Sequence, residues 1–175
     1  RGNGITIAAG ASQNTEAGIY HSRNIQIIDN KIGTDFSGNS TSAAYGNGCS
    51  GIQVIGGEDI IIRNNVIGSN GANGPINGMG GQSGIELINS SGVEISSNYI
   101  GVGANGITNM SNTNGGISFY SDNGDLCNLS HRCQNNNIEI NNNLIAFNNG
   151  NGIQVKPGNS QNINITDNQI YRNSG

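Results

Sequence analysis

A glycine–isoleucine step that returns at a nearly fixed interval is the feature that most restricts the fold of this sequence. The step recurs at intervals of 32 to 36 residues, at Gly18, Gly51, Gly84, Gly116 and Gly152. After each step comes a short run that ends in asparagine, such as NIQIIDN or DIIIRNN, and an isoleucine stands two residues beyond that asparagine. Self-similarity at this period is typical of solenoids, whose repeats stack on one another. The spacing therefore predicts about five coils with three short strands each.

Aliphatic residues alternate with polar ones inside the predicted strands. Because successive side chains of a strand point to opposite faces, residues two apart share a face. One face of the first strand carries Ile19, Ile52, Ile85, Ile117 and Ile153. No segment keeps the i, i+3, i+4, i+7 stripe of an amphipathic helix, which argues against a helical solenoid. The pattern predicts an all-β parallel β-helix with aliphatic rows stacked along its axis.

One asparagine recurs at the same place in every predicted coil, between the second and third strands. These residues are Asn30, Asn65, Asn98, Asn143 and Asn168. Asparagine tolerates the left-handed backbone conformation that a tight corner requires. Its amide can also bond to the same amide in the next coil. The chain contains 33 asparagines among 175 residues, so five matches in five coils are not expected by chance. We predict an asparagine ladder at this corner.

The composition fits an ordered repeat better than a disordered chain. Only 33% of the residues are hydrophobic, which is low, but the chain has just 10% charged residues and two prolines. Disordered chains are usually rich in charge or proline. We therefore expect one β-helix domain over residues 1–175, in which 1–17 form a partial coil or a cap. Long loops are expected at 34–50, 69–83 and 102–115, with an inserted loop at 121–136.

Charge and hydropathy exclude two classes of partner. The net charge is −4, and the seven lysines and arginines are scattered along the chain. Nucleic acids and anionic membranes are bound by clusters of such residues. The sequence has no run of about 18 apolar residues, so no membrane span is predicted.

The cysteines bear on the compartment. Cys127 and Cys133 bracket the segment CNLSHRC, and a disulfide between them would indicate an oxidising environment. The alternatives are free thiols and a metal site that includes His131, although this spacing matches no zinc pattern. Cys49 is either a buried thiol or an intermolecular link. We expect an extracellular or cell-surface location.

The segment NKIGTDFSGNSTSAAYGNGCSGIQV resembles the right-handed parallel β-helix repeat of the pectin-lyase-like superfamily. In a common bacterial version of that repeat, an IGTD-x-x-G stretch leads through a Gly/Asn-rich loop into the next GIxV strand. NVIGSNGANG and NYIGVGANG follow the same plan less closely, and the match covers about residues 18–175. The resemblance implies a right-handed parallel β-helix. Members of the superfamily include polysaccharide lyases and hydrolases, epimerases, phage tailspikes, adhesins and structural surface proteins.

The resemblance also implies where a sugar would bind, because enzymes of this fold usually bind it along the first strand or an adjacent face. Outward positions there are Tyr20, Gln53, Glu86, Glu94, Glu139 and Gln154. A hydrolase needs two carboxylates at the scissile bond, and a lyase needs an acid, a base and often Ca²⁺. The DPH, NTD, DD, GHG and RIK signatures are absent. We therefore predict no catalytic residue, no metal site and no cofactor.

Apolar residues also occur at outward positions of an otherwise polar solenoid. The first row is Val66, Tyr99 and Leu144, and the second is Ile55, Ile88 and Tyr120. Such rows either lie under the long loops or form a packing surface for another molecule. The sequence favours an extracellular structural or adhesive solenoid that self-associates end to end or laterally, as a filament or surface fibre would. The alternative is a polysaccharide-binding module or a lyase- or epimerase-type enzyme, with an extracellular polysaccharide as partner.

Overall fold

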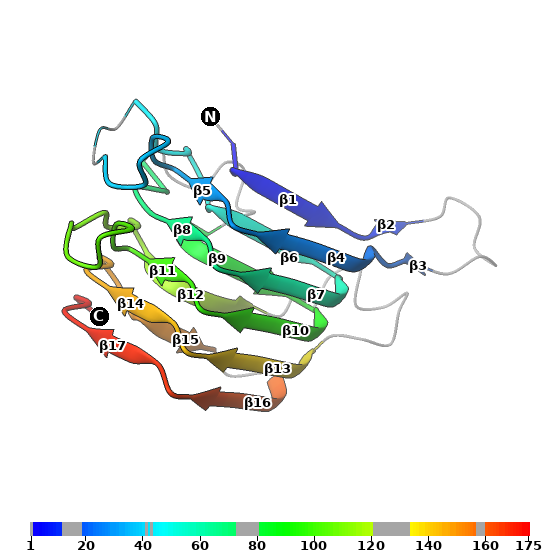
Figure 1. Cartoon of the computed structure of the whole chain (residues 1–175). Helices are drawn as coiled ribbons and strands as arrows, with labels where there is room; N and C mark the ends of the chain where they lie inside the picture. Colours follow the sequence, from blue (N-terminus) through cyan, green and yellow to red (C-terminus); the bar gives the residue numbers. More distant parts are fainter. Residues whose placement is uncertain are drawn as a thin grey trace.

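The computed structural model describes residues 2–11, 19–40, 42, 44–72, 81–120, 134–156 and 160–175, which form strands and no helix. Fifteen of the strands form three parallel sheets of five strands each (Figure 1). The first sheet contains β1 (Ile5–Ala8), β6 (Ile52–Ile55), β9 (Ser83–Ile88), β12 (Gly115–Tyr120) and β15 (Ile153–Val155). The second contains β4 (Arg23–Ile28), β7 (Glu58–Arg63), β10 (Ser91–Ser96), β13 (Asn135–Asn141) and β16 (Ser160–Thr166). The third contains β5 (Lys31–Ile32), β8 (Val66–Ile67), β11 (Tyr99–Ile100), β14 (Leu144–Ala146) and β17 (Gln169–Tyr171).

Each coil supplies one strand to each sheet in chain order, and the coils are numbered 1 to 5 from the N-terminus. Every strand pairs in parallel with its counterpart in the next coil, as in the register Ile62 to Ile95 to Ile140. This confirms the predicted right-handed parallel β-helix of about five coils. Within the described residues there is no helix long and apolar enough to cross a membrane.

Aliphatic rows fill the interior. Residues that stack in register include Ile60, Val93 and Ile138 in the second sheet and Ile67, Ile100 and Ile145 in the third. All six are at most 1% exposed. β-Branched side chains pack well on pleated surfaces, and full burial of one such side chain stabilises the fold by about 1.5–3 kcal/mol. These rows are the main apolar contact between successive coils.

The first strand of coil 1 is β1, so the prediction that placed it at Gly18 and Ile19 is wrong. Ile5 pairs with Ile52 in the first sheet. A Cβ at Gly4 would lie 2.7 Å from the carbonyl oxygen of Gly51, which matches the crowding at Gly51 one coil later. The segment proposed as a partial coil or cap therefore supplies a full strand.

A strand pair stands where the sequence predicted the start of coil 1. β2 (Gly10–Ala11) and β3 (Ile19–Tyr20) pair with each other in antiparallel fashion. Both strands lie between β1 and β4 in the sequence, and Figure 1 shows β2 and β3 to the side of the stacked sheets. This insertion lengthens coil 1. It contains the pair Gly18 and Ile19, which by coincidence stands at the same distance from Gly51 and Ile52 as the steps of successive coils stand from each other.

Side-chain hydrogen bonds join the corner asparagines of successive coils. The Nδ2 atoms of Asn30, Asn65 and Asn98 each donate to the Oδ1 of the next residue in the row, at 3.0–3.1 Å. Asn143 donates in the same way to Asn168 at 2.9 Å. The left-handed conformation, however, belongs to the residue before each asparagine. These residues are Asp29, Asn64, Ser97, Asn142 and Asp167, with φ between 54° and 60°. The predicted backbone role of the asparagines is therefore wrong.

A second row of asparagines lies at the corner between the third strand and the next first strand. Its members are Asn47, Asn70, Asn112, Asn148 and Asn173, joined by Nδ2-to-Oδ1 hydrogen bonds of 2.8–2.9 Å. Asn112 and Asn148 are 0% exposed. Because buried amides without partners are costly, this row holds the loop ends of successive coils in register.

Candidate functional site

A buried polar network occupies the outward face of the first sheet. Glu86 is 2% exposed and Gln53 5% exposed. The Glu86 carboxylate accepts hydrogen bonds from Gln53 Nε2 and the Gly81 backbone N–H, both at 2.8 Å. Asn3 Nδ2 donates to Gln53 Oε1 at 2.9 Å. On the same face, the hydroxyl groups of Ser83 and Ser118 form a hydrogen bond with each other. Gln53 and Glu86, predicted to face a sugar, are therefore enclosed, and the network stabilises the face.

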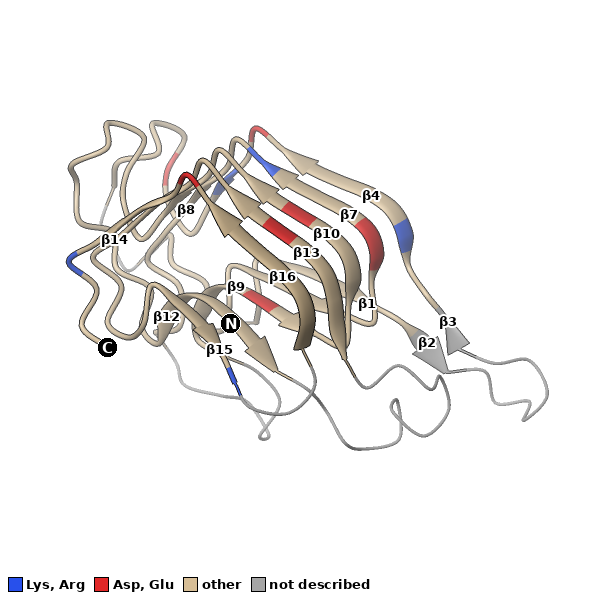
Figure 2. Ribbon diagram, turned by 90° about the horizontal axis from the view of Figure 1, so that it is seen from below, with Lys and Arg blue, Asp and Glu red and all other residues tan. Residues whose placement is uncertain are grey.

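The carboxylates of the second sheet are more open. Glu94 and Glu139 are in register on β10 and β13, and Figure 2 shows the acidic positions of these two strands side by side. Glu94 is half-buried and Glu139 is exposed. Glu94 Oε1 accepts from Ser96 Oγ at 2.6 Å, and Glu139 Oε2 accepts from Asn164 Nδ2 at 3.3 Å. Within the described residues no group of three or more His, Cys, Asp or Glu could hold a metal ion. The two glutamates are members of a polar outer face.

A loop lies beside two members of the first apolar row. Val66 is buried, whereas Tyr99 and Leu144 are half-buried. A methyl group added at Gly106 would lie 3.8 Å from both the Tyr99 and the Leu144 side chains. The loop that contains Gly106 is tied to the preceding long loop, because Ala104 N donates to Gly38 O at 2.9 Å. The loop at Gly106 therefore lies over part of the Tyr99 and Leu144 side chains.

The long loop after β5 has its own internal bonds. Asp35 Oδ1 accepts from Ser37 Oγ at 2.8 Å and from Gly38 N at 3.1 Å. The hydrogen bond from Ser37 is the main reason why the pKa of the Asp35 carboxyl is lowered. The carboxylate thus closes a turn in this loop.

Residues of the second apolar row are half-buried at the C-terminal ends of β6, β9 and β12. Ile55, Ile88 and Tyr120 stack in register. The Lys156 ammonium lies 4.0 Å from the centroid of the Tyr120 ring. Such a contact shields the aromatic face while the charged group stays in water. Gln154, another predicted sugar-facing residue, is half-buried on β15.

An open groove of about 430 Å³ runs beside the first asparagine row, on the outside of the corner between the second and third sheets. Its lining spans coils 2 to 5 and consists of Asn64, Ser97, Asn98, Tyr99, Asn142, Asn143, Leu144, Asp167 and Gln169. Amides and a hydroxyl supply most of its polar groups, and Tyr99 and Leu144 supply an apolar wall. Sequence reasoning missed this groove, because its wall combines corner residues and third-sheet residues of four coils, which only the folded corner brings together.

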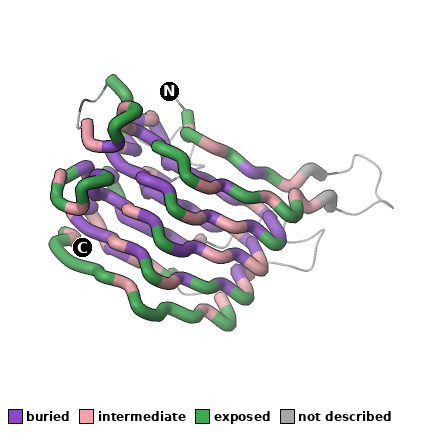
Figure 3. Tube along the Cα trace, in the orientation of Figure 1, coloured by how far each residue is buried: buried purple, intermediate pink, exposed green. Residues whose placement is uncertain are grey.

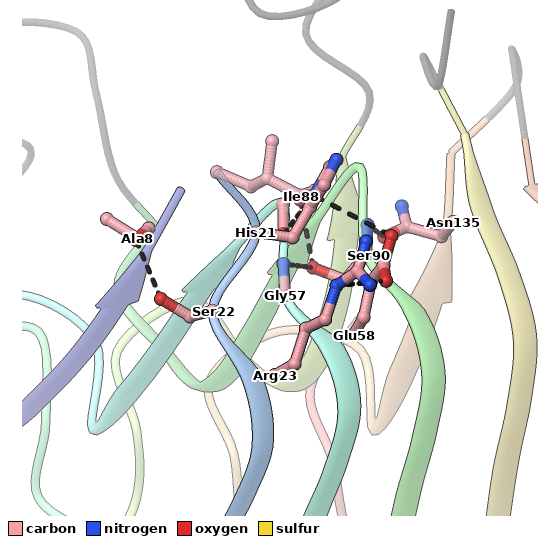
Figure 4. Close-up of polar contacts among 10 residues, drawn as sticks. Ala8, His21, Ser22, Arg23, Gly57, Glu58, Ile88, Ser90 and Asn135 are labelled. Carbon is pink, nitrogen blue, oxygen red and sulfur yellow. Dashed lines mark hydrogen bonds and ion pairs between the residues drawn. The ribbon is translucent and has the colours of Figure 1, made fainter. Parts of the chain in front are cut away.

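A charged cluster fixes the insertion of coil 1 to coil 2. Arg23 Nε lies 2.8 Å from Glu58 Oε2, and His21 Nδ1 donates to the carbonyl oxygen of Gly56 at 2.8 Å. His21 Nδ1 also lies 3.9 Å from Glu58 Oε1. Figure 4 shows His21 and Arg23 converging on the corner that begins β7. This corner is further held by Ser90 Oγ, which accepts from Gly57 N. The cluster anchors the end of the insertion where β4 begins.

Apolar residues are exposed at the coil-5 end of the stack. Val155, Ile165 and Ile170 are 44%, 43% and 46% exposed, although each continues an interior row. Their counterparts in coil 4, which are Phe119, Ile140 and Ile145, are at most 1% exposed. β15, β16 and β17 are the edge strands of their sheets, and Figure 3 shows that exposed residues predominate along β16 and β17. We define Val155, Ile165, Ile170 and these edges as the coil-5 face.

Cys127 and Cys133, and with them most of the predicted loop at 121–136, lie outside the described residues. The Tyr20 backbone pairs with Gly10 in the insertion and not with the first sheet. Its predicted place on the sugar-facing strand is therefore wrong. Cys49 is buried.

Comparisons of the chain with protein-family models, with curated proteins and with solved structures gave no significant match.

Proposed function

We propose that this chain is an extracellular structural β-solenoid, a stiff element of a surface or fibre, related to the pectin-lyase-like superfamily without serving as one of its enzymes. The observation that carries the proposal is the continuity of the stacked rows. Two asparagine rows and the interior aliphatic rows run from coil 1 to coil 5, so each coil is held to the next by hydrogen bonds and by apolar packing. Stacking of this kind gives a repeat protein its stiffness.

The acidic residues support the same proposal. A hydrolase requires two accessible carboxylates at the scissile bond. Glu86 is enclosed by Gln53 and Gly81. Glu94 and Glu139 bond to neighbouring serine and asparagine side chains on the outer face of the second sheet. For the extracellular setting, the support is the cysteine pair at 127 and 133, whose disulfide would need an oxidising compartment.

A turnover screen tests the structural role. The purified chain would be incubated with alginate, pectin and related polymers, while unsaturated products are followed by ultraviolet absorbance and reducing ends by a colorimetric assay. We expect no turnover. Robust turnover that Glu94→Gln or Glu139→Gln abolishes would overturn the proposal, with Asn164→Asp as the control change on the same face. Force spectroscopy adds a positive test, since a stiff element should unfold cooperatively at high force.

Polysaccharide binding without turnover is a second candidate, and the groove beside the first asparagine row favours it. Amide and hydroxyl groups can bond to sugar hydroxyls while the Tyr99 ring packs on the apolar face of a sugar. Gel electrophoresis in polysaccharide-containing gels would show retardation of the wild type. Tyr99→Ala should reduce the retardation, and Tyr45→Ala, a change at an exposed tyrosine outside the groove, should not. Equal retardation of the two variants would argue against the groove as the binding site.

A further inference from the structure

The groove beside the first asparagine row lies between two rows of side chains, to which each coil contributes one residue. The first rim is the corner row with left-handed backbone conformation, and its members in the groove are Asn64, Ser97, Asn142 and Asp167. The second rim is a row of the third sheet that stacks in register, and its members in the groove are Tyr99, Leu144 and Gln169. Because both rims follow the stacking of the coils, the groove runs parallel to the axis of the solenoid.

The first rim carries polar side chains that are available to a ligand. Within the described residues, no hydrogen bond uses the side chains of Asn64, Ser97 or Asp167, all of which are exposed. The buried Asn98 between the rims differs, because its amide already donates to the Ile62 carbonyl oxygen at 2.8 Å and to the next asparagine of the row. Amide and hydroxyl groups both donate and accept hydrogen bonds, as the hydroxyls of a sugar do.

The second rim is apolar at its centre. Tyr99 and Leu144 are in register on β11 and β14, and both are half-buried. The faces of a pyranose ring carry C–H groups that pack on such side chains, whereas its edges carry hydroxyls. A polymer of these rings with equatorial hydroxyls and linkages is a straight ribbon with polar edges and apolar faces. The two rims present the same combination, and their central residues belong to coils 3 and 4, which have described coils on both sides.

Charge restricts the ligand further. Asp167 is the only charged residue among those that line the groove. Lys31 belongs to coil 1, before the groove begins, and Arg63 does not line it. A carboxylate that loses water without gaining a cationic partner pays a large desolvation penalty. A uronic-acid polymer would bring one carboxylate per ring into this groove and would meet no cation there.

We propose that the groove binds a straight, uncharged, β-linked polysaccharide that lies parallel to the solenoid axis. The proposal rests on polysaccharide binding, the second candidate function above, and names its ligand class. The sugar edges would bond to Asn64, Ser97 and Asn142, while one face of the ribbon packs on Tyr99 and Leu144. With a rise of about 4.8 Å per coil, four coils span about 14 Å, so the groove would contact several sugar rings.

A peptide fits the groove less well. Extended peptides are commonly recognised through free backbone groups at the edge of a sheet. The backbone N–H groups of Tyr99 and Leu144 already donate to the carbonyl oxygens of Asn65 and Asn98, both at 2.9 Å. The groove therefore offers side chains and not a strand edge.

Affinity gel electrophoresis with two derivatives of one polymer tests the charge selectivity. Hydroxyethyl cellulose is uncharged and carboxymethyl cellulose is anionic, while both have the same β-linked backbone. At physiological ionic strength, where distant charges are screened, we expect hydroxyethyl cellulose to retard the wild type and carboxymethyl cellulose to leave its mobility unchanged. Soluble starch, an uncharged α-linked polymer that coils, should retard it much less. Equal retardation by starch and hydroxyethyl cellulose would contradict the straight ligand.

A charge change inside the groove sharpens the test. Gln169→Lys places an ammonium group in the lining and should produce retardation by carboxymethyl cellulose at low salt. Gln26→Lys makes the same change at an exposed residue outside the groove and should behave as the wild type does. Equal retardation of both variants would mean that the net charge of the protein sets the selectivity, which defeats the proposal. Circular dichroism would verify that each variant folds.

Calorimetric titration with cello-oligosaccharides tests the axial arrangement. The association constant should rise about tenfold from the disaccharide to the shortest chain that spans the groove, and then level off. Tyr99→Ala should remove most of this gain, and Tyr45→Ala, outside the groove, should not. An affinity independent of chain length would rule out a ligand that lies along the coils.

The outcomes separate this inference from the function on which it rests. Retardation of the wild type by carboxymethyl cellulose or polygalacturonate, as strong as that by hydroxyethyl cellulose, would overturn the ligand class and leave polysaccharide binding standing. Retardation by none of these polymers would overturn both the ligand class and the binding function, while the structural role of the solenoid would be unaffected.

Discussion

Coil 3 and coil 5 carry isoleucine at the same interior positions of the second and third sheets, yet the surroundings of these residues differ. Ile95 and Ile100 in coil 3 are 0% exposed, whereas their counterparts Ile165 and Ile170 in coil 5 are 43% and 46% exposed. Coil 3 lies between coils 2 and 4, while coil 5 contacts a described coil on one side only. The contribution of a repeat position to the free energy of unfolding therefore depends on its place in the stack as well as on its residue type.

The largest difference between the two coils is expected for the interior isoleucines. Ile95→Ala leaves a cavity between two neighbouring coils and should lower the free energy of unfolding by about 3–4 kcal/mol. Ile165→Ala should lower the free energy of unfolding by about 1 kcal/mol, since the Ile165 side chain is already partly exposed to water. Urea denaturation at low protein concentration, where oligomers are absent, measures both. Equal losses would show that the coil-5 end is covered in solution.

A smaller difference is expected for the asparagine row. Asn98→Ala removes an acceptor for Asn65 N and a donor to the carbonyl oxygen of Ile62. Because these groups are buried, the loss should be about 2 kcal/mol. Asn168→Ala leaves Asn143 open to water and should cost about half as much. Asn98→Ser and Asn168→Ser serve as milder controls in the same thermal unfolding series, and a larger loss at Asn168 would contradict the comparison.

The smallest difference is expected on the outward face of the first sheet. Glu86→Gln replaces an acceptor of two short hydrogen bonds by an amide whose NH₂ group faces another donor. We expect Glu86→Gln to lower the free energy of unfolding by about 1 kcal/mol. Gln154→Glu, at the half-buried end of the same row in coil 5, should change the free energy of unfolding by less than about 0.5 kcal/mol. Chemical denaturation of both variants at neutral pH checks the pair, and no effect of Glu86→Gln would show that the network is open to solvent.

The sequence predicted most of the repeat correctly. The period of the glycine–isoleucine step and the alternation inside each run located the three strands of coils 2 to 5. The strand at Ile5 was missed because the insertion at 9–22 breaks the period, and a second glycine–isoleucine pair inside that insertion restores it by coincidence. Only the pairing between strands in the folded chain shows that the first strand of coil 1 begins at Ile5 and not at Ile19.

The second asparagine row illustrates another limit. Asn70, Asn148 and Asn173 each follow the third-strand isoleucine by three residues, but Asn112 and Asn47 follow theirs by 12 and 15. Loops of different length hide this common register from any search at fixed spacing. The signal that could have revealed part of the row is an asparagine four residues before a glycine–isoleucine step, which occurs at Asn47, Asn112 and Asn148. Likewise, the groove beside Tyr99 depends on the angle at a corner and has no counterpart in the linear pattern.

By itself the sequence determined the period, the inward face of the strands from β4 onward and the position of one asparagine row, because these follow from local alternation and from repetition. The tertiary structure alone decided which outward residues are enclosed, as with Gln53 and Glu86, and which interior residues reach the surface, as with Ile165 and Ile170. The physical reason is that burial depends on neighbours distant in sequence. A row of identical residues has an interior and an end only after the coils have stacked.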